Sequence, residues 1–215
     1  VEQSETELIN EKNMLIRSMA HDIRTPLAGL QSYAEIIKME NKKGAIPTEH
    51  IDVIFNKICE IKGLTDQLFD YSLACNEEAL ELDAPCNMES AIGDYLSEMA
   101  FVLRENSFSL DIEKLIWKDF KITVNSNFLG RIFNNITNNI CKYADNKAPV
   151  CVSSIYRNKD AGIEITNHIS DKSSLFNTTG MGIRNITLMM KQMNGWAIVS
   201  HNNTEFRITL WFSRA

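Results

Sequence analysis

Residues 18–30, Ser-Met-Ala-His-Asp-Ile-Arg-Thr-Pro-Leu-Ala-Gly-Leu, carry three side chains that could carry out chemistry together. Histidine has a reference pKa of about 6.5, so most of the His21 imidazole should be neutral and nucleophilic at pH 7. Asp22 can accept the proton that an attacking imidazole loses. Thr25 follows one helical turn later on the same face, where its hydroxyl could orient a water molecule. The spacing predicts a nucleophilic histidine with an adjacent base.

Pro26 follows directly, although a proline inside a helix costs about 3 kcal/mol or more. Its nitrogen cannot donate to the carbonyl of Asp22, so we expect a bend in the helix one turn after His21. Such a bend would leave mobility where a second domain must dock. For an isolated His-Asp pair, the alternative is a surface histidine on a coiled coil.

A second stretch, Arg-Ile-Phe-Asn-Asn-Ile-Thr-Asn-Asn-Ile-Cys-Lys-Tyr-Ala-Asp at residues 131–145, is rich in amides. Asn135, Asn139 and Lys142 are spaced by four and then three residues, which places them on one face of a helix. Asparagine is a poor helix former, so such a cluster needs an explanation. An amide oxygen suits Mg²⁺ and a lysine ammonium suits phosphate. A surface patch of amides is the alternative.

Gly180 and Gly182 lie just before a predicted helix. Glycines let backbone N–H groups approach an anion, and a helix N-terminus favours negative charge. A Gly-x-Gly pair alone is weak evidence, since it is often only a turn.

Two long helices should position the histidine. Apolar residues recur at steps of three, four or seven over residues 5–40, and at steps of three and four over residues 48–76. Gly44 and Pro47 interrupt the pattern between them. Two such helices form an antiparallel hairpin that leaves its own apolar stripe uncovered. Two hairpins together make a four-helix bundle, so we expect a homodimer.

The rest of the chain should fold separately, with residues 1–76 as the hairpin, 77–87 as a hinge and 88–215 as a second domain. Helices are predicted at residues 88–104, 127–143 and 183–193, and strands at 108–112, 121–124, 150–156, 162–167, 196–201 and 205–212. The predicted fold class is α+β: a helical hairpin forming a dimeric four-helix bundle, followed by a two-layer α/β sandwich.

Composition excludes several classes of function. The net charge of -6 gives no electrostatic surface for DNA or RNA. No run of about 18 apolar residues occurs, so we expect no membrane contact by this part of the protein. The five cysteines are odd in number and lack metal-ligand spacing, which favours free thiols in a reducing cytoplasm over a metal site. The chain starts at Val1 without a methionine, so it looks like a fragment of a longer protein whose upstream part could include membrane spans. The expected localisation is that of a cytoplasmic fragment of a protein anchored in the plasma membrane.

Residues 18–30 resemble the H box of sensor histidine kinases of two-component systems, Ser-x-His-(Glu or Asp)-(Leu or Ile)-Arg-Thr-Pro-Leu, with Ser18 one place early. The resemblance implies that His21 is the phosphorylated residue and that the hairpin is a dimerisation and phosphotransfer domain. It also implies that Asp22 supports phosphotransfer and that Thr25 supports dephosphorylation of the partner.

Residues 135–143 resemble the N box of the same kinases, with Asn135, Asn139, Lys142 and Tyr143 matching and Ile140 in place of the usual alanine. By resemblance, Asn139 holds the Mg²⁺ that bridges the phosphates of ATP. Asn135 and Lys142 then line the phosphate side, and Tyr143 packs near the nucleoside.

Gly180 and Gly182 resemble the G2 box, and the last third of the chain resembles the Bergerat-type ATP-binding domain shared with gyrase-like ATPases. This implies that both glycines bind the nucleotide.

One family motif is degenerate. Where these kinases carry Asp-x-Gly-x-Gly, the chain has Asn167 followed by His168, Ile169, Ser170 and Asp171. An asparagine oxygen can accept from the adenine amine, but a hydrogen bond to a charged group contributes about 1.5–3 kcal/mol against about 1 for a neutral one. Kinases resembling the peptide-antibiotic sensors of Gram-positive bacteria show similar asparagine variants.

These resemblances imply a protein-histidine kinase that uses ATP and Mg²⁺ and passes the phosphoryl group to an aspartate of a response-regulator receiver domain. The regulator should contact the first helix at positions such as Ala28, Gln31, Ser32 and Glu35, and should also contact the second helix. A nucleotide-deficient scaffold or phosphatase is the alternative that the degenerate motif leaves open. A gyrase-like ATPase would explain the asparagines and glycines but not residues 18–30. Whether phosphorylation occurs in cis or in trans stays open.

Overall fold

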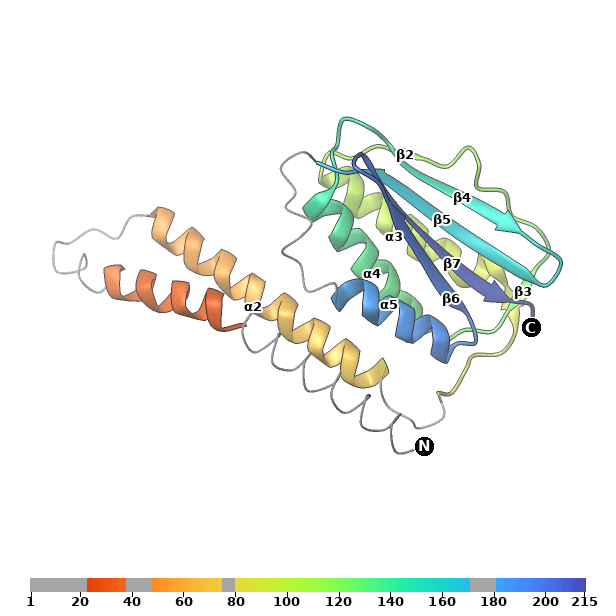
Figure 1. The fold of residues 1–215 in the computed structure, drawn as a ribbon, viewed down its shortest axis with the longest axis horizontal. Helices are drawn as coiled ribbons and strands as arrows, with labels where there is room; N and C mark the ends of the chain where they lie inside the picture. Colours follow the sequence, from red (N-terminus) through yellow and green to blue (C-terminus); the bar gives the residue numbers. More distant parts are fainter. Residues whose placement is uncertain (1–22, 38–47, 75–79, 171–180) are drawn as a thin grey trace. The chain divides into compact units, whose positions relative to one another are not determined.

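The computed structural model describes residues 23–37, 48–74, 80–170 and 181–215, and the chain divides into two compact units, Val1–Ser72 and Leu73–Ala215 (Figure 1). His21, Asp22 and Gly180, three residues predicted to act in the site, lie outside the described residues. Most of the predicted hinge is described, from residue 80 onward, and it ends in a short strand, β1 (Cys86–Asn87).

The first unit is a helical hairpin. Residues 23–37 are helical within the predicted 5–40 helix, and α2 (Thr48–Ala74) ends two residues before the predicted limit. The Tyr33 and His50 rings lie 5.7 Å apart, and a Cβ at Gly29 would lie 3.8 Å from Cε of Lys57. The later residue of the first helix therefore lies beside the earlier residue of α2, and the earlier residue beside the later one. The two helices are thus antiparallel. Pro26 is buried inside the first helix.

The hairpin leaves apolar side chains in solvent. Ile51, Phe55 and Ile58 are between 49% and 63% exposed and are spaced by four and three residues, so they share one face of α2. A stripe of this kind on a helix needs a second surface to cover it.

The second unit has two layers (Figure 1). A five-stranded sheet has the order β2-β4-β5-β7-β6, where β2 is parallel to β4 and every other pair is antiparallel. The strands are β2 (Leu110–Asp111), β4 (Val150–Tyr156), β5 (Asp160–His168), β6 (Trp196–His201) and β7 (Glu205–Ser213). Three helices cover one face: α3 (Met88–Glu105), α4 (Ser126–Tyr143) and α5 (Met181–Gln192). A separate antiparallel pair joins β1 to β3 (Lys121–Ile122).

The core of this unit lies between the sheet and the helices. Alternate residues of β5 and β7 point inward, since the side-chain period of a strand is two, and Ile163, Ile165, Ile208 and Leu210 are all buried. On α4, buried apolar residues recur at steps of three and four: Leu129, Ile132, Phe133, Ile136 and Ile140. The predicted α+β class and two-layer arrangement are therefore confirmed. Strand order and the β1–β3 pair were not predicted.

Among the described helices, none combines the length and the apolar character needed to cross a bilayer.

Candidate functional site

Helix α4 presents the predicted amides beside its buried stripe. The Asn125 side chain caps the helix by accepting a hydrogen bond from the N–H of Phe128 at 3.0 Å. Asn135 and Asn139 are half-buried, whereas Asn134, Asn138 and Lys142 are exposed. The two amides that match the predicted motif are thus the two that the fold partly encloses.

Asn135, Asn139 and Gly182 come together where α4 meets the start of α5. A Cβ at Gly182 would lie 3.3 Å from Oδ1 of Asn135 and 3.6 Å from Nδ2 of Asn139. Few real Cβ atoms have a neighbour as close as 3.3 Å, so this position favours glycine. The Nδ2 group of Asn135 donates to the Arg131 carbonyl at 2.9 Å, which fixes the side-chain amide and turns its oxygen toward Gly182.

Backbone hydrogen bonds tie the end of α4 to the end of β5. The N–H of Asp145 donates to the His168 carbonyl at 2.9 Å, and the N–H of Ser170 donates to the Tyr143 carbonyl at 2.9 Å. Between them, Ala144 and Ile169 form an isolated antiparallel bridge. These contacts hold Asn167 next to the helix that carries the other amides.

Asn167 is 7% exposed, and its Nδ2 group donates to the carbonyl of His168 at 3.0 Å. Only the nitrogen end of an amide can donate to a carbonyl, so this hydrogen bond fixes which end is which. The oxygen Oδ1 therefore remains the acceptor end of the side chain. Ile169, which stands where the Asp-x-Gly-x-Gly motif has its first glycine, is buried, and its N–H donates to the Thr204 carbonyl at 2.8 Å.

Tyr143 is half-buried at the end of α4, and burial raises the pKa of its phenol. The phenol therefore stays neutral at physiological pH and offers an uncharged ring. His168 is exposed and Lys142 is exposed, so both could reach a bound anion from the rim of the site.

The donor set fits a nucleotide-bound magnesium ion better than a resident metal. Within the described ranges, no group of three or more His, Cys, Asp or Glu residues could hold a metal ion. Amide oxygens are suitable ligands for Mg²⁺, which usually keeps several waters and relies on substrate phosphates for the rest of its shell. Asn139, whose amide borders Gly182, has the chemistry to hold such an ion.

Thr25, the remaining predicted site residue, lies in the helix of the first unit and is exposed. The predicted regulator contacts Ala28, Gln31, Ser32 and Glu35 are also exposed.

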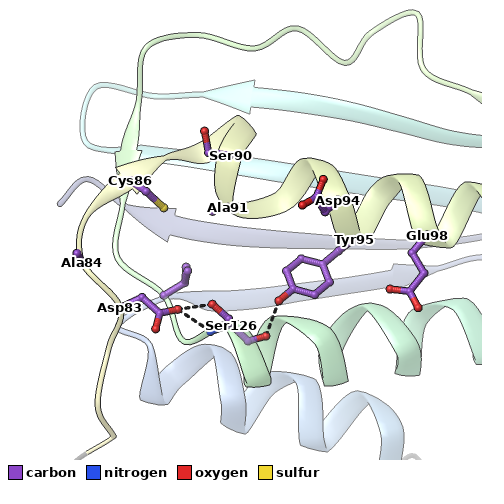
Figure 2. Close-up of a pocket in the computed structure, with 10 residues that line it drawn as sticks. Asp83, Ala84, Cys86, Ser90, Ala91, Asp94, Tyr95, Glu98 and Ser126 are labelled. Carbon is purple, nitrogen blue, oxygen red and sulfur yellow. Dashed lines mark hydrogen bonds between the residues drawn. The ribbon is translucent and has the colours of Figure 1, made fainter.

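Two features of the second unit were missed by sequence reasoning. Asn185, on α5 one turn after Gly182, is fully buried, a rare environment for an amide. Its position three residues after Gly182 could have indicated that it shares the glycine's face. The other feature is a pocket of about 630 Å³ at the beginning of α4, lined in part by Asp83, Tyr95 and Ser126 (Figure 2). No spacing signal could have found it, because its walls come from segments far apart in the sequence.

The chain is similar to known proteins in sequence and in fold. Residues 11–74 match the His Kinase A (phospho-acceptor) domain. The sensor histidine kinase YrkQ of Bacillus subtilis (strain 168) is 30% identical over 207 residues, which are 96% of this chain and 48% of YrkQ. This chain thus spans about half the length of that relative.

Solved structures share the fold. The histidine kinase ThkA, solved in complex with the response regulator TrrA, superposes with a TM-score of 0.77 at 15% identity, covering 100% of this chain and 65% of the other. The Acinetobacter baumannii histidine kinase AdeS gives a TM-score of 0.68 at 16% identity, covering 90% of this chain and 98% of the other. Together with the phospho-acceptor match and the similarity to YrkQ, these findings show that the chain belongs to the bacterial sensor histidine kinases, of which it comprises the catalytic core.

Proposed function

We propose that this chain transfers the γ-phosphoryl group of ATP to His21 and then to an aspartate of a response-regulator receiver domain. The observation that carries the proposal is the meeting of Asn135, Asn139 and Gly182 at the junction of α4 and α5, which offers amide oxygens and a close backbone approach to one ligand. The family membership supports the same chemistry.

In the proposed reaction, a ring nitrogen of His21 attacks the γ-phosphorus of ATP. The bond from that phosphorus to the bridging oxygen breaks, ADP leaves, and Asp22 accepts the imidazole proton. Asn139 would hold Mg²⁺, which supplies positive charge to the transferring group. Lys142 would add a second positive charge near the phosphates of ATP, and Asn135 would line the same side of the nucleotide site.

At the base end, Asn167 would accept a hydrogen bond from the exocyclic amine of adenine through Oδ1. The hydrogen bond from its Nδ2 group to the His168 carbonyl supports this role, since it leaves Oδ1 as the end of the side chain that can accept. Tyr143 would pack its neutral ring beside the nucleoside, and Gly180 would act with Gly182 on the phosphates.

The same proposal includes a homodimer. Ile51, Phe55 and Ile58 form an apolar face on α2 that a second hairpin would cover in a four-helix bundle. A receiver domain would dock on the hairpin through exposed Ala28, Gln31, Ser32 and Glu35 of the first helix and through α2. The histidine kinase ThkA, which has a similar fold, forms a complex with the response regulator TrrA.

The decisive experiment uses labelled ATP with Mg²⁺. We expect an acid-labile, base-stable phosphate on the protein that maps to His21 and is absent from His21→Gln. Label on a different residue, or none in the unsubstituted protein despite nucleotide binding, would reject kinase activity.

Exposed Thr25 supports a second activity, hydrolysis of the phosphorylated regulator, because its hydroxyl can orient a water molecule. Thr25→Ala should keep autophosphorylation within about twofold and lose most regulator dephosphorylation, since it removes the hydroxyl that would orient the water. Equal loss of both activities would contradict this role.

One observation favours a different function. Asn167 is neutral and Ile169 fills the place of a glycine, so the base site is weaker than the family pattern, which suits a nucleotide-deficient scaffold or phosphatase. Isothermal titration with a non-hydrolysable ATP analogue and Mg²⁺ separates the two. No heat at millimolar nucleotide would favour the scaffold.

A further inference from the structure

The segment that leads into the second unit is hydrogen-bonded to the beginning of α4 (Figure 2). The N–H of Asp83 donates to the Val124 carbonyl at 2.7 Å, and the Asn125 side chain donates to the Glu81 carbonyl at 2.9 Å. The Asp83 carboxylate accepts from the Ser126 N–H at 2.8 Å and from the Ser126 hydroxyl. This set of four hydrogen bonds is called the Asp83 anchor below.

The Asp83 anchor has a clear electrostatic basis. The first N–H groups of a helix have no partner within the helix. Asn125 satisfies the N–H of Phe128, and Asp83 satisfies the N–H of Ser126 from 43 residues away in the sequence. A carboxylate at this end also interacts favourably with the helix dipole. Tertiary structure, and not a local capping motif, therefore supplies this partner.

The Asp83 anchor and the amide site occupy different ends of one helix. Asn139 lies 13 residues beyond Ser126, which corresponds to about 20 Å along an α-helix. The beginning of α4 is also joined to α3, because the Tyr95 hydroxyl donates to the Ser126 carbonyl at 2.7 Å (Figure 2). The Tyr95 ring further stacks on Phe133 of α4, with centroids 5.8 Å apart.

We propose that Asp83 is a positioning residue for phosphoryl transfer. It fixes residues 81–83, near the start of the second unit, to α4, so that a displacement of these residues also moves the helix that carries Asn135 and Asn139. The inference rests on the proposed kinase function. It adds a role for residues 81–83, which sequence reasoning assigned to a hinge. When residues 81–83 are hydrogen-bonded to α4, a movement of these residues also moves α4. Without those hydrogen bonds, the same movement would leave α4 in place.

The same pocket provides a matched control. Asp94 lines the pocket with an exposed carboxylate from α3, but none of the hydrogen bonds of the Asp83 anchor involves it. Asp94→Ala thus removes one negative charge from the same place and leaves the anchor intact. Ser126→Ala removes only the hydroxyl partner and keeps the backbone hydrogen bond.

The test compares Asp83→Ala, Ser126→Ala and Asp94→Ala in the full chain by three measurements. Hydrogen exchange at the Ser126 amide reports the anchor without any need for activity. Titration with an ATP analogue reports the nucleotide site, and the initial rate of His21 labelling at saturating ATP reports transfer.

For Asp83→Ala we expect faster exchange at Ser126, nucleotide affinity within about twofold, and labelling about tenfold slower, because a lost charge-assisted hydrogen bond is worth roughly that factor. Ser126→Ala should show a smaller effect of the same kind, and Asp94→Ala none.

Faster exchange with an unchanged labelling rate would overturn the inference, since the anchor would then have no role in transfer. Parallel loss of nucleotide affinity and labelling would also overturn it, because Asp83 would be serving only the stability of the domain. Absence of label in the unsubstituted protein would instead reject the kinase proposal, while the exchange result would still show whether the anchor exists.

Discussion

The two units of this chain differ in how their exposed apolar side chains are arranged. In the α+β unit, Phe101 on α3 and Ile198 on β6 are exposed on separate elements, while buried residues from distant segments form a core between the sheet and three helices. In the hairpin, Ile51, Phe55 and Ile58 lie along one face of α2. We therefore call the α+β unit complete and the hairpin incomplete, since the proposed homodimer would cover that face.

The largest expected effect tests the incomplete unit. Phe55 is 63% exposed in the hairpin and Phe101 is 65% exposed on α3, so the two side chains form a matched pair. Phe55→Glu should weaken self-association by about a hundredfold or more, because a symmetric interface would lose two buried phenylalanines. Phe101→Glu should leave it unchanged.

Analytical ultracentrifugation over a concentration series would measure both variants. A dimer that survives Phe55→Glu with unchanged affinity would show that this face of α2 is not the interface.

A smaller effect tests the complete unit at its site. Gly182→Val should lower the affinity for a magnesium-bound ATP analogue by about tenfold, since a branched side chain would displace the Asn135 and Asn139 amides. Gly93 on α3 is the control, because a Cβ there meets nothing within 4 Å. Gly93→Ala should keep the affinity and raise the free energy of unfolding by about 0.5–1 kcal/mol.

Titration calorimetry and chemical denaturation would check this pair. Loss of stability in Gly182→Val without loss of affinity would remove Gly182 from the binding site.

The smallest effect concerns base recognition. Asn167→Leu keeps the size of the side chain and removes its acceptor oxygen, so ATP affinity should fall about fivefold, the value of one neutral hydrogen bond. The preference for ATP over GTP should shrink by the same factor, because guanine has no amine at the position where adenine carries its exocyclic amine. Competition binding with both nucleotides measures this, and an unchanged preference would show that Asn167 does not contact the base.

Sequence reasoning succeeded best where the signal was local. The heptad-like steps predicted α2 to within two residues at its end, and the turn residues at 202–204 predicted the β6–β7 hairpin. The amide spacing predicted that Asn135 and Asn139 would share a face, and both border Gly182. These features depend on a helical or strand period, which the spacing of residue types along the sequence indicates directly.

Sequence reasoning did not predict the contacts between distant segments. Residues 77–87 were assigned to a hinge from their composition, which gave no sign that Asp83 is hydrogen-bonded to Ser126 or that β1 pairs with β3. For Asn185, the spacing from Gly182 indicates a shared helix face, but only the packing of α5 in the core makes that residue fully buried.

By itself, then, the sequence determined which residues could react and which elements would carry them: a histidine beside a base on a long helix, and amides on one face of another. Only the tertiary structure decided that Asn135, Asn139 and Gly182 meet, that Asn167 presents an oxygen, and that Asp83 holds the beginning of α4. The physical reason is that periodicity fixes neighbours within an element, whereas hydrogen bonds between elements depend on strand order and helix packing, which no short-range pattern encodes.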